Sequence, residues 1–271
     1  MADTNPALGD FATLKLARPD RHVLVVTLNR PEVSNAINTQ MGRDLLSLWS
    51  GLIAAPTEVR AVVLTGAGTK AFCAGGDLKE RNGMTKDEWQ AQHEIFERQY
   101  WALLDCPVPV IGAANGHAYG GGTEILLACD FVYAARTARF ALTEVTLGIM
   151  PGAGGTQFLP RAVGEARAKE IIFTGKPFSA EDAYGWGLVN RLCETADGVV
   201  ADALATARTI ADNAPLSIRQ AKKSIHHGLD MDLKNALLYE IEAYNRLIVT
   251  EDRLEGVRAF NEKRKPQFTG R

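Results

Sequence analysis

The stretch AYGGGTEILLACD, residues 118–130, places three consecutive glycines directly before Glu124 and an apolar run. A glycine has no Cβ, so a ligand or a neighbouring segment can approach its backbone closely. A helix is expected to begin near Thr123, and its first amides would then point at a bound group. Taken alone, the stretch also fits a close backbone crossing beside a helix, with Glu124 solvated in the first turn.

The segments on either side alternate between strand and helix patterns. Met41, Leu45, Leu48 and Leu52 recur at helical spacing within residues 37–53. The expected strands are continuous apolar runs of the kind buried on both faces of a parallel sheet: HVLVVTLN (22–29), VRAVVLTG (59–66), VPVIGAANG (108–116) and DFVYAA (130–135). This alternation predicts an α/β fold with largely parallel strand pairing.

The pattern changes near Ala201, after which no strand-like run remains. Apolar side chains then recur at helical spacing in two stripes, over residues 218–229 and 237–248. We expect three parts in the chain: a flexible N-terminus (1–10), an α/β core (11–200) and a C-terminal helical region (201–271). The helical region can meet another subunit or cap the core of its own chain, and the pattern does not choose between these roles.

Composition and charge argue against several function classes. Hydrophobic residues make up 46% and charged residues 23% of the 271, as in ordinary globular proteins. The formal net charge of −2 gives no electrostatic reason to expect nucleic acid or an anionic membrane as the main partner. No apolar run approaches the roughly 20 residues of a membrane span, and the first ten residues resemble no secretory or transit signal. A cytoplasmic protein is expected.

The cysteines and histidines lack the spacing of metal ligands. The four cysteines form no C-x-x-C pair and the five histidines form no H-x-x-x-H pair. We therefore expect no metal site. His117 lies beside the glycine stretch, but a single histidine without a partner is more often packed or hydrogen-bonded than catalytic.

A second glycine-rich segment lies at AFCAGGDLKE, residues 71–80, after a predicted strand. Asp77 follows Gly75 and Gly76 and is expected to cap a short helix, which leaves the preceding amides pointing outward. Such a turn can hold an anion or the oxyanion of a reacting carbonyl group.

A different class of protein is suggested by GAGTKA, residues 66–71, which fits the dinucleotide-binding turn G-x-G-x-x-A. The acidic residue that would support it should end a second strand roughly 20 residues later. Asp87 and Glu88 fall instead in a helical pattern, so a nicotinamide cofactor is not expected.

Glu124 and Glu144 are two carboxylates among apolar residues, and Glu144 precedes a further glycine-rich loop. Apolar surroundings raise the pKa of a carboxyl group, and a second carboxylate nearby raises it further, which suits acid and base catalysis. The alternative is a first-turn helix acid and an unrelated loop residue, because the sequence does not show that the two side chains meet.

Four motifs, in order and spacing, resemble the enoyl-CoA hydratase/isomerase (crotonase) superfamily: AFCAGGDLKE (71–80), NGHAYGGGTEILLACD (115–130), PGAGGTQFLPRAVG (151–164) and FNEKRKPQF (260–268). The likeness extends over residues 24–268. It implies a core built as a spiral of ββα units and a C-terminal helical region that forms trimers, so that the chain is a homotrimer or hexamer. It also implies an acyl-CoA thioester substrate, a place in fatty acid metabolism and no cofactor beyond the coenzyme A of the substrate.

The resemblance carries particular roles to particular residues. It places the two main-chain donors to the thioester oxygen at Gly76 and Gly121. It implies a hydratase in which Glu124 orients and deprotonates the water that attacks C3 and Glu144 supplies the proton to C2. The alternative within the same family is an isomerase that moves a double bond with a single base.

The resemblance also implies contacts to coenzyme A. The stretch along which the family lays the pantetheine and adenine corresponds to Gly76, Asp77, Leu78 and Lys79. Phe260 and Lys263 match positions that reach the coenzyme A of a neighbouring subunit, although Lys263 also fits a solvated charge near the end of the chain.

Two shorter segments, DLKERNGM (77–84) and EDRLEG (251–256), resemble the methylglutaconyl-CoA hydratase branch, some of whose members bind AU-rich RNA. The corresponding helix here has Arg43 as its only basic residue, so no RNA role is expected. The resemblance also places an acyl-pocket wall at three aromatic residues with helical spacing, a pattern equally typical of plain core: Trp89, Phe96 and Tyr100.

Overall fold

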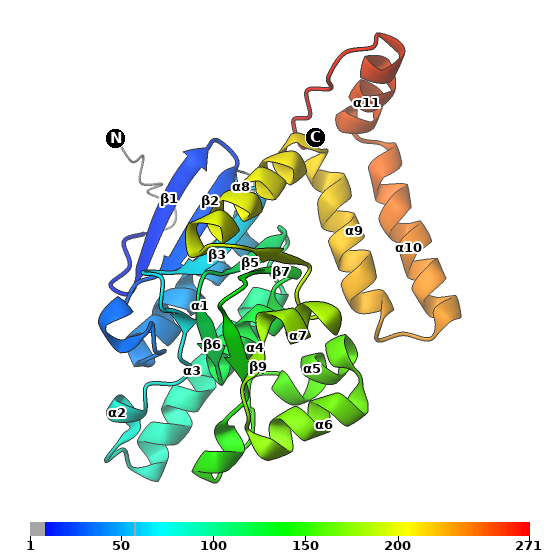
Figure 1. Ribbon diagram of the computed structural model, residues 1–271. Coiled ribbons are helices and arrows are strands. Elements are labelled where there is room, and N and C mark those ends of the chain that lie inside the picture. The colour runs from blue at the N-terminus through cyan, green and yellow to red at the C-terminus, as the bar shows by residue number, and fades with distance from the viewer. Residues whose placement is uncertain (1–8, 57) are drawn as a thin grey trace.

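The structure is a computed structural model that describes residues 9–56 and 58–271 (Figure 1). Its larger sheet has six strands, and only β1 and β2 pair antiparallel. In spatial order these are β1 (Leu14–Asp20), β2 (Val23–Leu28), β3 (Ala61–Gly66), β5 (Val110–Ala114), β7 (Phe131–Ala135) and β10 (Arg191–Cys193). The four predicted strands are β2, β3, β5 and β7, so the predicted α/β class and the largely parallel pairing are confirmed.

A smaller sheet lies beyond one end of these strands and contains β4 (Ala71–Cys73), β6 (His117–Tyr119), β8 (Arg139–Ala141) and β9 (Phe178–Ser179). The chain passes from the larger to the smaller sheet three times, at β3 to β4, β5 to β6 and β7 to β8, and each passage is followed by helix. This repetition is the spiral of ββα units that the resemblance implies.

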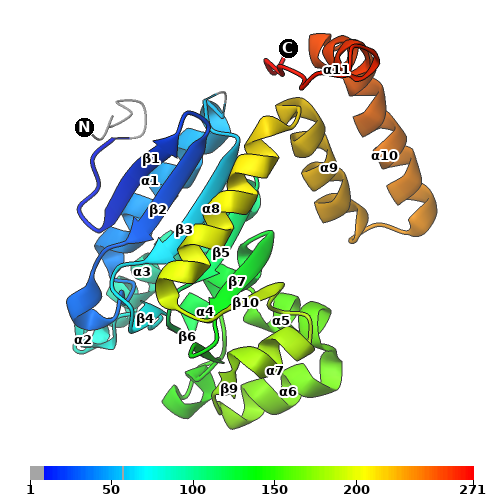
Figure 2. The ribbon, with the colours of Figure 1, turned by 45° about the horizontal axis from the view of Figure 1, so that its top comes forward.

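The helices that follow these passages surround the smaller sheet (Figures 1 and 2). They are α2 (Leu78–Arg81) and α3 (Lys86–Leu104), then α4 (Gly121–Ala128), then the 3₁₀ helix η2 (Glu144–Leu147) with α5 (Gly155–Val163) and α6 (Glu165–Thr174). The remaining helices of this part are η1 (Pro31–Val33), α1 (Thr39–Ala54) and α7 (Ala180–Gly185). The helix predicted within residues 37–53 is α1, which Asn38 caps by accepting a hydrogen bond from the Met41 amide at 2.9 Å.

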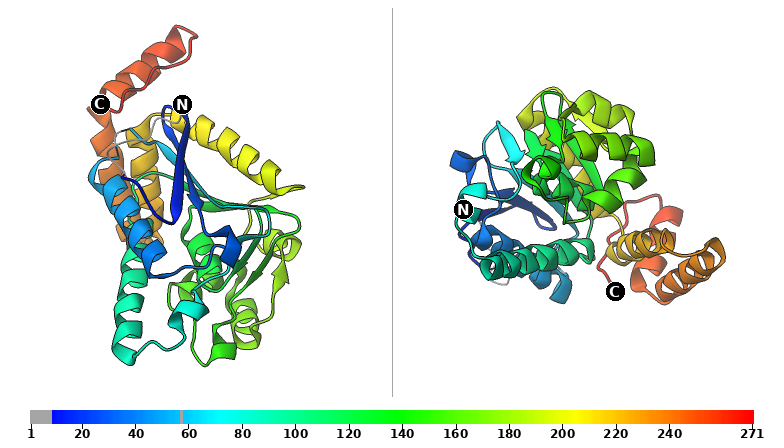
Figure 3. Two further views of the ribbon diagram at one scale, coloured as in Figure 1. Left: turned by 90° about the vertical axis from the view of Figure 1, so that its left-hand side faces the viewer. Right: turned by 90° about the horizontal axis from the view of Figure 1, so that it is seen from below.

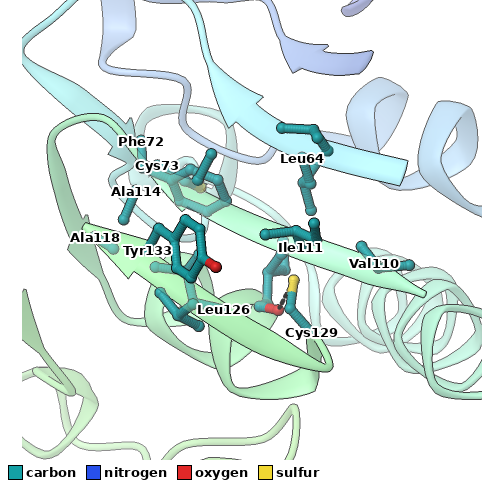
Figure 4. Packing of buried hydrophobic residues seen from close by; sticks show 14 of the residues in the cluster. Leu64, Phe72, Cys73, Val110, Ile111, Ala114, Ala118, Leu126, Cys129 and Tyr133 are labelled. Atoms are coloured by element: carbon teal, nitrogen blue, oxygen red, sulfur yellow. Dashed lines mark hydrogen bonds between the residues drawn. The ribbon is translucent and has the colours of Figure 1, made fainter. Parts of the chain in front are cut away.

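The core lies between the larger sheet and the helices that cover it. Figure 4 shows Leu64 of β3, Ile111 of β5, Tyr133 of β7 and Leu126 of α4, which all belong to one buried hydrophobic cluster. All four side chains are buried, so α4, which begins at Gly121 rather than near Thr123 as expected, is anchored in the centre of the molecule. Burial of this kind supplies most of the stability of a helix as short as α4.

The C-terminal part of the chain contains four helices and no strand within the described range 196–271. The first, α8 (Ala196–Asp212), lies across the larger sheet and buries Val199, Ala203, Ala207 and Ala211 in the core. The boundary placed between residues 200 and 201 falls inside this helix. The segment that extends away from the core starts after it and consists of α9 (Pro215–Gly228), α10 (Leu233–Ile248) and α11 (Glu251–Asn261) (Figures 2 and 3).

Residues 1–8 of the expected flexible N-terminus lie outside the described residues. Among the helices formed by residues 9–56 and 58–271, none has the length and apolar character that crossing a membrane requires.

Candidate active site

A cavity of about 510 Å³ opens between α3, α4, η2 and the turns that precede α2 and α4. All four residues predicted for the oxyanion hole and for catalysis line it: Gly76, Gly121, Glu124 and Glu144. The spiral brings them together because the turns at the ends of β4, β6 and β8 lie side by side in the smaller sheet. The two carboxylates that the sequence left unconnected therefore share one cavity.

Gly76 and Gly121 present backbone donors to this cavity. Gly121 is the first residue of α4, where an amide has no intrahelical acceptor. Within the described residues, neither the Gly76 nor the Gly121 amide donates a hydrogen bond to the protein. The two turns are in contact, since a Cβ added at Gly75 would lie 3.2 Å from the Gly121 nitrogen. Two free donors in adjacent turns can bind one oxygen atom.

The position of Gly76 is fixed from both sides. The Ile37 amide donates to the Gly75 carbonyl at 2.8 Å, and the Asp77 amide donates to the Ile37 carbonyl at 2.9 Å. As predicted, Asp77 caps α2, where its carboxylate accepts from the amides of Lys79 and Glu80. The same carboxylate pairs with Arg30 at 2.9 Å. The turn is therefore held before substrate arrives.

Glu124 lies on the first turn of α4 and is 3% exposed. Its Oε1 accepts hydrogen bonds from the amides of Ala153 at 2.8 Å and Gly155 at 2.9 Å. Burial raises the pKa of Glu124 to about 7; the two hydrogen bonds oppose this shift, and the charge of Glu144 adds to it. A carboxyl group with a pKa near neutrality exchanges protons readily at physiological pH.

Glu144 begins η2 and is 9% exposed. Burial raises the pKa of its carboxyl group above the ordinary value. Its Oε2 is buried and makes no hydrogen bond to any part of the chain that the structure describes. A Cβ added at Gly120 would lie 3.0 Å from Glu144 Oε1, and Gly120 has φ +52°, so both space and backbone conformation favour glycine there.

The three aromatic residues expected at the acyl pocket lie on α3, but only Trp89 and Phe96 line the cavity. Tyr100 instead lines a second cavity of about 1000 Å³, and its hydroxyl group lies against Gly154. A Cβ at Gly154 would overlap that hydroxyl group, so Tyr100 supports the loop that holds Glu124 rather than the substrate cavity.

The residues predicted to contact coenzyme A lie in two regions, one at the cavity and α2 and the other at the end of α11. Leu78 lines the cavity with Gly76. Asp77 directs its side chain to α2 and Arg30, and Lys79 is exposed on α2. Phe260 is 83% exposed on α11, and Lys263 is exposed just after it, outside the cavity of their own chain. Their contacts to coenzyme A stay predictions.

Several cavity residues were not recognised in the sequence. Arg81 ends α2 and lines the cavity, and His93 with its partner Glu97 lines it from α3, with 3.0 Å between Nε2 and Oε1. Asp77 is predicted to cap a short helix, and Arg81 lies one helical turn later. The sequence alone therefore places Arg81 near the Gly76 turn. His117 lies outside the cavity and accepts a hydrogen bond from the Arg139 amide at 3.1 Å.

The turn that resembles a dinucleotide-binding motif has a different structural role. Residues 66–71 connect β3 to β4, whereas a dinucleotide-binding turn leads into a helix. The Asn115 side chain closes it by donating to the carbonyl groups of Gly66 at 2.8 Å and Gly68 at 2.6 Å. These glycines accommodate the crossing between the two sheets.

Two backbone amides that are unpaired within the described residues and two buried carboxylates line one cavity. Such a set suits an enzyme that polarises a carbonyl group and moves protons beside it. The profile of the enoyl-CoA hydratase/isomerase family matches residues 18–271. The chain belongs to this family.

Individual relatives cover nearly the whole chain. A short-chain-enoyl-CoA hydratase of Clostridium acetobutylicum is 41% identical over 90% of this chain and 92% of its own. An (E)-benzylidenesuccinyl-CoA hydratase of Thauera aromatica is 41% identical over 92% of this chain and 96% of its own. The crystal structure of an enoyl-CoA hydratase from Bacillus anthracis superimposes with a TM-score of 0.93 at 42% identity, covering 96% of this chain and all of that one.

Proposed function

We propose that the chain is an enoyl-CoA hydratase that adds water across the 2,3 double bond of a 2-enoyl-CoA to give a 3-hydroxyacyl-CoA. The observation that carries the proposal is the pair Glu124 and Glu144, both buried in one cavity with the free amides of Gly76 and Gly121. Names of relatives such as short-chain-enoyl-CoA hydratase agree with this activity.

In the proposed mechanism, the thioester oxygen accepts hydrogen bonds from Gly76 and Gly121. These bonds draw electron density from C3 and stabilise the enolate that forms as water adds. Removing one such donor costs about 10²–10³ in rate in other enzymes. Both amides precede or begin a helix, where the helix dipole also favours negative charge.

The carboxylates divide the proton transfers. Glu124 takes a proton from the water molecule as the water oxygen bonds to C3, and Glu144 gives its proton to C2 as the enolate collapses. The proton on Glu124 must return to Glu144 before the next turnover, so the hydrogen and the hydroxyl group both come from water. The fixed Oε1 of Glu124 suits orientation of the nucleophile, and the unpaired Oε2 of Glu144 suits proton delivery.

An isomerase is the second candidate, because the family covers both reactions. Moving a double bond requires one base, whereas this cavity holds two buried carboxylates, which favours hydration. Loss of the conjugated thioester absorbance of crotonyl-CoA tests the proposal. Consumption of crotonyl-CoA supports a hydratase; an enzyme that leaves it unchanged but converts a 3-enoyl-CoA to the 2-enoyl isomer is an isomerase.

We further propose that the chain assembles as a homotrimer or hexamer through the region after α8. Helices α9, α10 and α11 expose many large apolar side chains, among them Ile225, Leu233, Tyr244 and Phe260. In such an assembly Phe260 and Lys263 would reach the coenzyme A bound to a neighbouring subunit. Light scattering coupled to size exclusion measures the assembly, and a monomer at micromolar concentration contradicts it.

The same proposal includes no cofactor beyond the coenzyme A of the substrate, a cytoplasmic location and a place in fatty acid metabolism. The acyl group is left open by the relatives, since one is named for a short chain and another for a benzylidenesuccinyl group.

A further inference from the structure

Tyr100 of α3 lies beside the catalytic carboxylate Glu124 without sharing its cavity. Its side chain is 5% exposed and lines the second cavity, of about 1000 Å³. The two cavities share a wall formed by residues 150–153. Burial raises the pKa of the Tyr100 hydroxyl group, and the nearby charge of Glu124 adds to this shift. The hydroxyl group therefore approaches Glu124 from behind this wall rather than through the substrate cavity.

The contact between Tyr100 and Gly154 is too close for a side chain at residue 154. A Cβ added there would overlap the Tyr100 hydroxyl oxygen and would lie 2.6 Å from its Cζ and 2.9 Å from its Cε1. Gly154 also has φ +88°, a conformation that favours glycine. The hydroxyl group and the ring edge of Tyr100 thus occupy the place that a side chain at residue 154 would take.

Gly154 stands between the two donors that fix Glu124. The amides of Ala153 and Gly155 donate to Glu124 Oε1 at 2.8 Å and 2.9 Å. Gly154 is also the N-cap residue of α5, and its carbonyl group accepts from the Phe158 amide at 2.8 Å. A displacement of Gly154 would therefore move both donors and the start of α5 together.

A second contact joins Tyr100 to α5. The ring centroids of Tyr100 and Phe158 are 6.2 Å apart, and their planes meet edge to face at 66°. The Tyr100 hydroxyl group is buried and makes no hydrogen bond within residues 9–56 and 58–271. Tyr100 thus meets the start of α5 at two points, and the contacts that the structure shows there are packing contacts.

We propose that Tyr100 is a positioning residue for Glu124, acting as a wedge that sets the amides of Ala153 and Gly155 against Oε1. The inference rests on the proposed function, in which Glu124 must present an ionised and oriented oxygen to water. Hydrogen bonds to an ionised carboxylate favour the ionised form, and a displacement of about 1 Å can cost 10²-fold in rate. Loss of the wedge should therefore change both the rate and its pH dependence.

The other charged groups around Glu124 come from three elements. Those that line its cavity are Glu144 on η2, Arg81 on α2, and His93 with Glu97 on α3. Among these groups, Glu144 is the one whose charge acts on the pKa of Glu124. A substitution at Tyr100 leaves all of them in place, so a changed pKa of Glu124 would report on its two amide donors.

The test uses Tyr100→Phe, which keeps the ring, and Tyr100→Leu, which removes the contact with Gly154. Crotonyl-CoA hydration is measured from pH 5 to 9. We expect Tyr100→Leu to lose about ten- to a hundred-fold in kcat/KM. The acid limb of its pH profile should move to higher pH, because weaker hydrogen bonds to Oε1 raise the pKa of a base that must be ionised. Tyr100→Phe should lose less than about five-fold and keep the wild-type limb.

A matched control is Tyr184→Leu, which shortens an exposed tyrosine of α7 that lines neither cavity. This variant should keep the wild-type kcat/KM and the wild-type limb.

A double-mutant cycle with Gly154→Ala tests the contact itself. The added Cβ overlaps the hydroxyl group of Tyr100 in the wild type but fills the space that Tyr100→Leu leaves. The strain of alanine at φ +88° is present in both backgrounds, so it cancels in the cycle. In urea unfolding, the double variant should lose less stability than the two single variants together. Additive losses would show that the two residues do not interlock, and would overturn the inference.

The outcomes separate the inference from the function on which it rests. If Tyr100→Leu loses stability or rate but keeps the wild-type limb, Tyr100 only supports the fold, and the positioning role is overturned. If Tyr100→Phe is as impaired as Tyr100→Leu, the hydroxyl group acts by a hydrogen bond, and the wedge is overturned. A wild type that leaves crotonyl-CoA unchanged contradicts the proposed function, whereas the unfolding cycle tests the interlock without substrate.

Discussion

Glu124 and Glu144 line one cavity from different elements, and within residues 9–56 and 58–271 only the Glu124 side chain accepts hydrogen bonds from backbone amides. The amides of Ala153 and Gly155 fix its Oε1, whereas Glu144 Oε2 is buried without a hydrogen bond in the described residues. Burial raises the pKa of both carboxyl groups. In the proposed hydration, Glu124 would be the oriented base and Glu144 the acid, because hydration needs one group of each kind.

The pKa of Glu124, about 7, predicts the pH dependence of the free enzyme. The base must be ionised, and kcat/KM reports ionisations of the free enzyme. Well below pH 7, kcat/KM for crotonyl-CoA should therefore fall about tenfold per pH unit. Steady-state rates between pH 5 and 8 measure this, and a kcat/KM that is constant over the range contradicts a base with this pKa.

The same raised pKa predicts that Glu124 destabilises the fold when ionised. The folded state binds the proton more tightly than the unfolded state, whose carboxyl group has the ordinary value of 4.5, so stability falls as the pH rises from 4.5 through 7. The shift corresponds to about 3 kcal/mol at pH 8. Glu124→Gln keeps an oxygen for the two amides and should be more stable than the wild type at pH 8, by up to this amount.

Urea unfolding at pH 8 and pH 5 measures the effect. The advantage of Glu124→Gln should shrink at pH 5, where the folded wild type already holds the proton. A variant that is less stable than the wild type at both pH values would show that burial of this carboxylate costs little.

Gly121 and Gly122 differ in whether they leave space for a Cβ atom. A Cβ at Gly122 would overlap the carbonyl oxygen of Cys73, whereas a Cβ at Gly121 would lie 3.5 Å from Ile37 Cδ1, an ordinary contact. Gly122→Ala should therefore destabilise the protein by about 1–3 kcal/mol. Gly121→Ala should change stability by less than about 1 kcal/mol, since alanine also favours the helix. Chemical denaturation of both variants tests the contrast, and equal losses would contradict it.

The ion pair between Arg30 and Asp77 should support both the fold and the rate. The two side chains are 19% and 10% exposed, and Asp77 follows the Gly76 donor directly. Burial by itself raises the pKa of Asp77, but hydrogen bonds from Arg30 and from the start of α2 outweigh it and lower that pKa. Arg30→Met leaves the buried carboxylate without its cation, so we expect a loss of about 2 kcal/mol and a kcat lowered about tenfold by displacement of Gly76.

A matched control is Arg208→Met, which breaks an exposed pair with Asp20 of 2.7 Å. Exposed pairs contribute little, so this variant should lie within about 0.5 kcal/mol of the wild type and keep its kcat. If Arg30→Met behaves like the control in both measurements, the Gly76 turn does not depend on its ion pair.

The sequence predicts a helix or strand well where its apolar residues follow the period of that element. The strands β2, β3, β5 and β7 are continuous apolar runs, and α1 carries an apolar stripe, so both were predicted close to their observed bounds. The core extends past residue 200 into α8, where Ala203, Ala207 and Ala211 pack against the sheet. Their side chains are small and form no strong apolar stripe, so the sequence pattern does not reveal this contact.

Side-chain surroundings were less predictable. Phe96 and Tyr100 belong to one stripe of α3 but face different cavities, which depends on where the loop before α5 crosses that helix. Arg81 is oriented by Gln92, eleven positions later, through a contact that no local pattern reveals. The family resemblance pointed to Glu124 and Glu144 as candidate catalytic residues. The structure shows that both are buried and that their hydrogen-bond partners differ.

Both buried carboxylates take part in the proposed hydration. The most direct measurement is kcat for crotonyl-CoA hydration in Glu124→Gln and Glu144→Gln, with Glu97→Gln as the control, because Glu97 lines the same cavity but is exposed and paired with His93. We predict that each of the first two variants loses about 10²–10⁴ in kcat, while Glu97→Gln loses less than about tenfold. Retention of hydration by either Glu124→Gln or Glu144→Gln at the level of the control would contradict the two-carboxylate mechanism.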